Sequence, residues 1–127
     1  MVIARRTSNH QVSHDDLATT LYPDLEKPPV LATARLLQWC ELAAGEELGN
    51  CSVVTSASVT QVAPAVLGAR ISISAVCTNV TGPRSIWYVT ASDDTELIAQ
   101  VTLQLALIDA RQYPAQQAVP KRQLSPV

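Results

Sequence analysis

The feature that most constrains this fold is a long stretch, residues 96–109, in which apolar and polar side chains alternate. Every second position carries an apolar side chain: Leu97, Ala99, Val101, Leu103, Leu105 and Leu107. Alternation with a period of two predicts a β-strand with one apolar face. Another apolar element must cover that face, so the chain needs a second layer.

Three more strands are predicted before this one. Residues 53–62, 70–79 and 84–91 also alternate and are rich in small and β-branched side chains. A loop from Pro64 to Gly68, a hairpin turn at Thr81-Gly82-Pro83 and a turn at Ser92-Asp93-Asp94 separate them. At the N-terminus, residues 2–12 favour a further strand, and Ser13 is placed to cap a short helix.

Residues 28–49 predict one long helix. Pro28 and Pro29 suit its start, and Gly49 suits its end. Leu37, Glu41, Ala44 and Leu48 are spaced by four, three and four residues, so they share one helix face, which Leu36, Cys40 and Ala43 widen. We expect this face to be buried, with Glu41 on it.

The predicted order is a strand, a long helix and four antiparallel strands. One helix with an apolar face and one sheet with an apolar face are most simply combined as a hotdog fold. We therefore predict an α+β hotdog with one long central helix wrapped by a curved antiparallel sheet of about five strands. An open α+β sandwich of another topology also fits the pattern. Residues 1–110 would form this single domain, and residues 111–127 a flexible C-terminal tail.

Composition excludes several classes of function. The 127 residues carry a net charge of −2 without a concentrated basic face, which argues against nucleic acid as a partner. No apolar run reaches the length of a membrane helix and no signal peptide is evident, so we expect a cytoplasmic protein with no membrane association. Cys40, Cys51 and Cys77 form no CxxC pair and are expected to be inert thiols. We expect neither a metal nor a cofactor.

Three residues could carry chemistry. Glu41 on an apolar stripe would be tuned by burial as an acid or base, unless Arg35 or Arg70 pairs with it as plain structure. Thr33 precedes it by eight residues, a rise of about 12 Å along a helix, so the two side chains cannot touch within one helix. Gln61 places an amide, which donates and accepts but does not titrate, at the end of a strand. Thr33 could equally be a helix cap, and Gln61 a satisfied amide at the edge of the core.

Two motifs resemble the fluoroacetyl-CoA thioesterase-like group of hotdog proteins. Residues 30–41, VLATARLLQWCE, are similar to the family's helix entry, and residues 55–68, TSASVTQVAPAVLG, to its strand and loop. The resemblance covers about residues 12–113. It implies that Thr33 and Glu41 act with a histidine on an acyl-thioester carbonyl. That histidine is Gln61 here, and the last strand reads Val101-Thr-Leu-Gln104 where many members carry a histidine.

The leading hypothesis is therefore an acyl-CoA or acyl-carrier thioester hydrolase. Thr33, Glu41 and Gln61 would be its catalytic residues, and Trp39, Pro64 and Gly68 would bind substrate. Because hotdog subunits generally pair edge to edge, the resemblance also implies a homodimer. The alternative is a hotdog protein that binds an acyl group or serves a pathway-specific role without efficient catalysis. A dehydratase is a weaker third option, because the acid–histidine pair it needs is absent.

Overall fold

The computed structural model describes residues 2–45 and 52–109. In chain order its elements are β1 (Ala4–Gln11), the 3-10 turn η1 (His14–Asp16), α1 (Ala18–Leu21), α2 (Thr33–Gly45), β2 (Ser52–Gln61), β3 (Arg70–Thr81), β4 (Arg84–Ser92) and β5 (Leu97–Leu107). The predicted tail, residues 111–127, lies outside the described residues, as do Leu48, Gly49 and Cys51.

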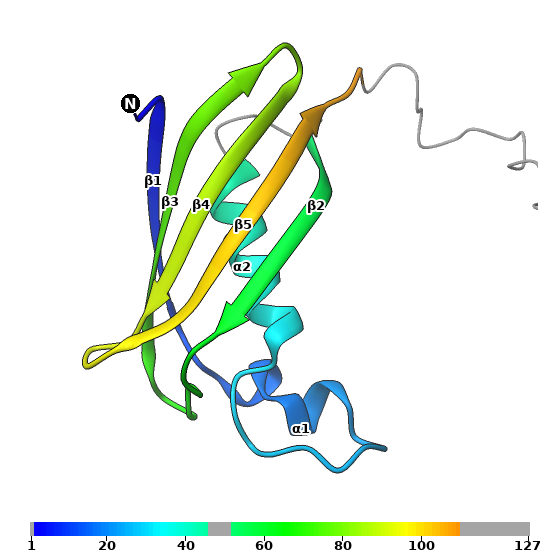
Figure 1. The fold of residues 1–127 in the computed structure, drawn as a ribbon. Helices are drawn as coiled ribbons and strands as arrows, with labels where there is room; N and C mark the ends of the chain where they lie inside the picture. Colours follow the sequence, from blue (N-terminus) through cyan, green and yellow to red (C-terminus); the bar gives the residue numbers. More distant parts are fainter. Residues whose placement is uncertain (1, 46–51, 110–127) are drawn as a thin grey trace, which may run out of the picture.

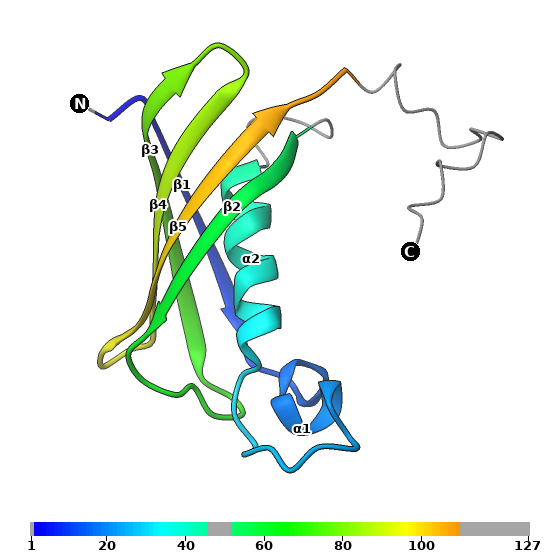
Figure 2. The same ribbon diagram turned by 45° about the vertical axis from the view of Figure 1, so that its right-hand side comes forward.

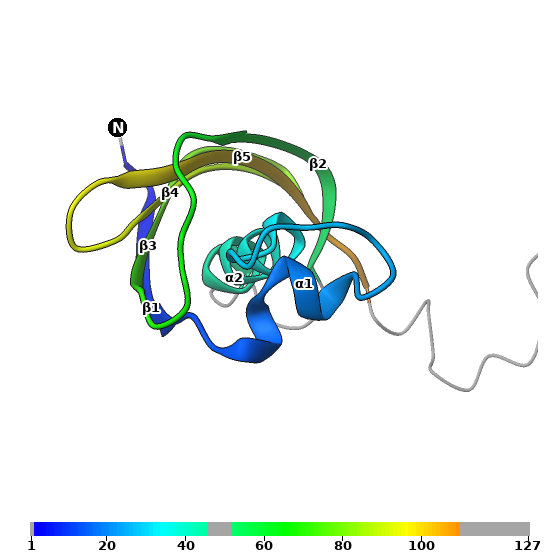
Figure 3. The same ribbon diagram turned by 90° about the horizontal axis from the view of Figure 1, so that it is seen from below.

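The five strands form one sheet in the order β1-β3-β4-β5-β2, and every neighbouring pair is antiparallel. The sheet curves around α2, which lies on its concave face (Figure 1, Figure 2). Seen along the helix, the strands arch over α2, and η1 and α1 lie at the open side of the arch (Figure 3). This is the predicted α+β hotdog fold, with β1 and β2 as its two edge strands.

The predicted turns take the backbone forms that their residues favour. β3 and β4 are joined by the two residues Gly82 and Pro83. Gly82 has φ +59°, the left-handed region that a two-residue hairpin of the type II′ kind requires at its first position. The predicted strand between Arg84 and Ala91 is therefore confirmed as β4.

The central helix is shorter than predicted at its start. Residues 28–32 are not helical; Val30 and Leu31 form isolated bridges with Val66 and Leu17. The helix begins at Thr33. Residues 30–32 use their backbone groups in bonds to other segments: the Val30 carbonyl accepts from the N–H of Ala18, and the N–H groups of Leu31 and Ala32 donate to the carbonyls of Ala65 and Asp16.

The buried face of α2 contains four of the residues predicted for it, Leu36, Cys40, Ala43 and Ala44, but not Glu41. Its buried residues are Leu36, Trp39, Cys40, Ala43 and Ala44. Glu41 is exposed, so the prediction that it lies on the buried face is wrong for the chain described here. Glu41 follows Leu36 by five residues, or about 140° around the helix. The helix turns its uncharged side to the sheet because burying an unpaired carboxylate costs several kcal/mol.

The core lies between α2 and the concave face of the sheet. Trp87 is its largest fully buried side chain. Cys40 and Cys77 are buried free thiols, and burial raises the pKa of Cys40 to about 12, which confirms the expectation of an inert thiol for this residue. None of the helices in the described part of the chain has the length and apolar character needed to span a membrane.

Candidate functional site

A shift of strand register decides which way Gln61 points. β2 pairs with β5, and the register shifts between Val54 and Ser56. Beyond this bulge, Val59 lies opposite the buried Val101, and Gln61 lies opposite the buried Ala99. Because alternate residues of a strand share a face, the Gln61 side chain lies on the concave side of the sheet, toward α2.

Thr33 and Gln61 are brought together by the fold. The Thr33 hydroxyl donates a hydrogen bond of 2.8 Å to Oε1 of Gln61, which joins the first residue of α2 to the last residue of β2. Nε2 of Gln61 donates a longer hydrogen bond, 3.4 Å, to the carbonyl oxygen of Ala63. An amide nitrogen carries two hydrogens, so Gln61 keeps one more donor. The Thr33 oxygen can still accept a hydrogen bond.

A cavity of about 350 Å³ adjoins this pair. Its lining comes from α1, from the segment that leads into α2, and from the end of β2; it includes Ala18, Tyr22, Lys27, Leu31, Thr33 and Gln61. The first turn of α2 also faces it through Ala34. The backbone N–H groups of a first helical turn have no partner inside the helix, so this wall favours a ligand with an electron-rich oxygen.

No carboxylate or imidazole belongs to the described lining of this cavity. Glu41, eight residues further along α2, is not among the lining residues. The alternative that Arg35 pairs with it does not hold, because Arg35 lies 3.2 Å from the Asp16 carboxylate and donates to Gln38. Within the described part of the chain, Glu41 therefore stands exposed and separate from the Thr33–Gln61 pair.

The three predicted substrate-binding residues lie elsewhere in the described chain. Trp39 is buried and stacks on His10, with ring centroids 4.4 Å apart. Pro64 is exposed in the loop after β2. Gly68 has φ +88° and donates from its N–H to the carbonyl of Val12, which closes that loop onto the end of β1. None of the three lines the cavity beside Thr33.

A polar cluster that the sequence did not reveal supports the cavity wall. The buried Asp16 accepts hydrogen bonds from N and Oγ of Ser13, at 2.8 and 2.9 Å, and pairs with Arg35. Its own carbonyl accepts from the N–H of Ala32, the residue before Thr33. Asp16 thus fixes the start of α2 against η1. Ser13 was expected to cap this segment, but nothing in the spacing identified Arg35 as the partner of Asp16.

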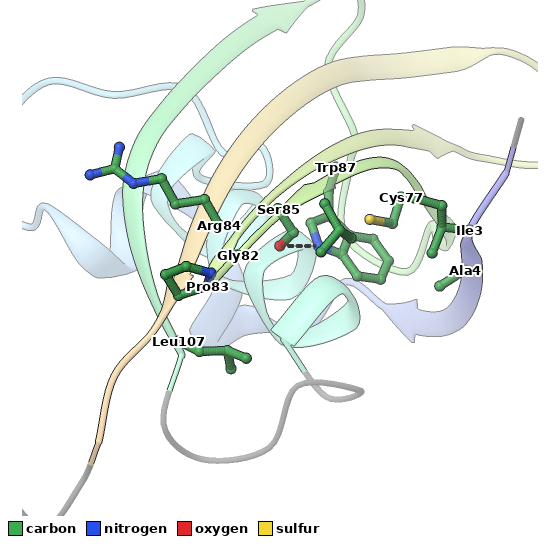
Figure 4. Close-up of a pocket in the computed structure, with 10 residues that line it drawn as sticks. Ile3, Ala4, Cys77, Gly82, Pro83, Arg84, Ser85, Trp87 and Leu107 are labelled. Carbon is green, nitrogen blue, oxygen red and sulfur yellow. Dashed lines mark hydrogen bonds between the residues drawn. The ribbon is translucent and has the colours of Figure 1, made fainter.

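A second cavity, of about 210 Å³, lies at the opposite end of the sheet. Trp87, Cys77 and Ile3 face it from the strands, and the Trp87 indole donates to Oγ of Ser85 (Figure 4). The Arg84 side chain, at its rim, points away from the indole (Figure 4). Its lining is mostly apolar, and Arg84 is the one charged side chain among the described residues that line it, so it offers less chemistry than the cavity beside Thr33.

Comparison with known proteins agrees with the family resemblance and with the fold. Residues 12–111 match the model of a family described as fluoroacetyl-CoA-specific thioesterase. A solved structure of the fluoroacetyl-CoA thioesterase FlK is 27% identical, with a TM-score of 0.82, over 94% of this chain and 98% of that one. A mutant of that enzyme, solved in complex with fluoroacetate and CoA, is 26% identical, with a TM-score of 0.82, over 90% of this chain and 99% of that one.

A hot-dog-like protein from Thermanaerovibrio acidaminovorans is 25% identical, with a TM-score of 0.75, over 87% of this chain and 85% of that one. A comparison with curated protein sequences finds no match.

Proposed function

Because the chain belongs to the fluoroacetyl-CoA-specific thioesterase family, we propose that it hydrolyses acyl thioesters, carried by CoA or an acyl carrier, in the cavity beside Thr33. The observation that carries the proposal is the 2.8 Å hydrogen bond between Thr33 and Gln61 at the start of α2. These are two of the three positions where sequence motifs suggested catalytic residues, and they meet at a cavity of suitable size.

The free N–H of Gln61 is suited to hold the carbonyl oxygen of the thioester as negative charge develops on it. Preorganised donors of this kind stabilise the tetrahedral intermediate, and losing one typically costs about 10²–10³-fold in rate. Thr33 orients this donor, because its hydroxyl donates a hydrogen bond of 2.8 Å to Oε1 of Gln61. Neither group titrates near neutral pH, so a separate base must take the proton from the attacking water.

Glu41 is the proposed base. Water adds to the carbonyl carbon and its proton passes to Glu41; the C–S bond then breaks, and the leaving thiolate takes up that proton. The products are a free acid and a free thiol. Glu41 thus takes the proton-accepting role of the family's histidine. Gln61, at the position of that histidine, can orient the substrate through hydrogen bonds but cannot accept a proton. Alternatively, the carboxylate attacks the carbonyl directly and water hydrolyses the resulting anhydride.

A second copy of the chain would account for the separation of Glu41 from the cavity. β2 is an edge strand of ten residues that contains neither a charge nor a proline, whereas the other edge strand, β1, carries Arg5 and Arg6. Charged residues and prolines are the usual protection of an edge against pairing. Ala57 lies on the concave face yet is exposed, so α2 leaves that part of β2 uncovered. We propose a homodimer paired through β2, in which each subunit's Glu41 serves the other's cavity.

Mixing two inactive variants tests this shared site. If Thr33 and Glu41 of different subunits work together, Thr33→Ala and Glu41→Gln are each inactive as homodimers. Refolded together, they form heterodimers in which one of the two sites has both residues intact. Thiol release should return to about a quarter of the wild-type rate, because half the dimers are mixed and each has one working site. If activity does not return although heterodimers form, the site lies within one chain.

The alternative, a protein that binds acyl groups without efficient catalysis, is favoured by the absence of a carboxylate or imidazole from the described cavity lining. The variant Gln61→His distinguishes a hydrolase from a protein that only binds acyl groups. Should the natural protein release no thiol while Gln61→His does, the fold has been kept for binding. Should the natural protein be active and Gln61→Ala lower the rate more than Gln61→His, Gln61 has the proposed role. Equal rates for the two variants would contradict it.

A further inference from the structure

The cavity beside Thr33 has an uneven charge. Lys27 is the one charged side chain among the described residues that line it, and neither an aspartate nor a glutamate faces it from there. Asp16 and Arg35, which lie behind this wall, pair with each other and so leave little net charge. A small cavity with a cation and no carboxylate attracts anions, since the potential of one charge is focused between low-dielectric walls.

Lys27 is held at the cavity without a carboxylate partner. Its Nζ lies 5.6 Å from the ring centroid of Tyr22, which also lines the cavity. Asp24 and Glu26 are in the same loop, yet within the described ranges Lys27 forms no ion pair with either. An ammonium group over an aromatic face can still donate hydrogen bonds to an anion.

The anion belongs to the acyl group rather than to the carrier. Lys27 lines the same cavity as Thr33 and Gln61, the two groups proposed to hold the reacting carbonyl. The phosphates of CoA or of an acyl carrier are separated from the sulfur by the whole pantetheine arm. Because Lys27 and Gln61 line one small cavity, of about 350 Å³, we place a charge bound at Lys27 while the carbonyl is at Gln61 on the acid side of the thioester.

We infer that the preferred substrates are thioesters of short dicarboxylic acids, whose second carboxylate pairs with Lys27. This inference rests on the proposed function, because it identifies the acyl class for that same cavity. Its test compares malonyl-CoA with propionyl-CoA, which have three-carbon acyl groups that differ in the terminal carboxylate. Thiol release is measured for each, with the spontaneous rate subtracted.

The wild-type protein should favour malonyl-CoA in kcat/KM by roughly fivefold, the effect of one partly exposed ion pair of about 1 kcal/mol. Lys27→Gln should abolish the preference, Lys27→Glu should reverse it, and Lys27→Arg should keep it. Arg84→Gln, which removes a cation at the other cavity, is the matched control and should leave the ratio unchanged. Equal use of the two substrates by the wild-type protein, or a preference that survives Lys27→Gln, would overturn the inference.

Two further measurements separate the sources of charge and the two proposals. Malonyl and propionyl pantetheine lack the phosphates, and the preference for the malonyl group should persist with them. If Lys27→Gln instead lowers the rate equally for both CoA thioesters and leaves both pantetheine thioesters unaffected, Lys27 binds the phosphates and the inference is refuted.

Thioether analogues that cannot be hydrolysed report binding alone by calorimetry. If no thioester is hydrolysed but the anionic analogue binds more tightly through Lys27, the charge selectivity holds and only the hydrolase proposal fails. Equal binding of both analogues refutes the selectivity itself.

Discussion

The hydrogen bond between Thr33 and Gln61 can be tested as a unit by a double-mutant cycle. Thr33→Val removes the hydroxyl at nearly constant volume, and Gln61→Leu removes the amide. The bond is 2.8 Å long, but both side chains are exposed. Its net contribution to folding should therefore be at the low end for a neutral pair, about 0.5 kcal/mol. In urea denaturation the two single variants and the double variant should all lie within about 1 kcal/mol of the wild-type protein.

The effect on catalysis should be much larger and should not add. If Gln61 holds the developing oxyanion and Thr33 fixes the orientation of Gln61, each single variant loses about 10²-fold in kcat/KM. The double variant should lose about the same factor, because removing either member already disables the pair. Thiol release from acyl-CoA measures all four proteins. Thr33→Ser keeps the donor and should retain most of the activity.

A different outcome would refute this reasoning. Losses that multiply, to about 10⁴-fold in the double variant, would mean that Thr33 and Gln61 act on the substrate independently. A double variant with full activity would remove both residues from the site.

Three other predictions concern the supports of the site. Asp16→Asn should destabilise the protein by about 2 kcal/mol in urea, because it breaks a largely buried ion pair with Arg35; a loss below about 0.5 kcal/mol would show that the pair contributes nothing. Burial lowers the pKa of His10 below 6.5, against a smaller opposing effect of Asp16, so the unfolded chain binds more protons and stability should fall as the pH drops through 6.5. His10→Phe, which keeps an aromatic ring for the stack on Trp39, should flatten this dependence, and His14→Asn is the matched control on an exposed histidine. Ala57→Lys should yield monomers in analytical ultracentrifugation, whereas a dimer that survives this change would not be paired through the middle of β2.

Most of the fold could be predicted from local pattern. The alternation in residues 96–109 predicted β5, and Gly82 and Pro83 predicted the hairpin between β3 and β4. Both predictions succeed because a strand period and a turn each depend on a few neighbouring residues. The start of the helix was harder to predict. Pro28 and Pro29 suit the approach to a first turn, but residues 30–32 stay non-helical because their backbone groups bond to Ala18, Ala65 and Asp16.

The error at Glu41 shows what a helical pattern leaves open. Leu37, Glu41 and Ala44 satisfy the same spacing as Leu36, Cys40 and Ala43, so spacing alone does not say on which of these two adjoining stripes the buried face is centred. The charge decides between them, because Leu36 and Cys40 can be buried without leaving a carboxylate in the core. The bulge in β2 was not predictable in the same way. It reverses the orientation of the strand between Val54 and Ser56, and no proline or glycine marks it in the sequence.

The contact between Thr33 and Gln61 depends on both of these unpredicted details. Had α2 begun at residue 28, Thr33 would lie inside the helix rather than at its first position. Without the bulge in β2, the Gln61 side chain would point away from α2. Glu41 lies on the solvent side of α2, about two helical turns from Thr33. In the homodimer that we propose, a second subunit covers the open edge at β2, and its Glu41 serves this cavity. The exposed position of Glu41 and the unprotected edge strand would then have one common explanation, a site shared between two subunits.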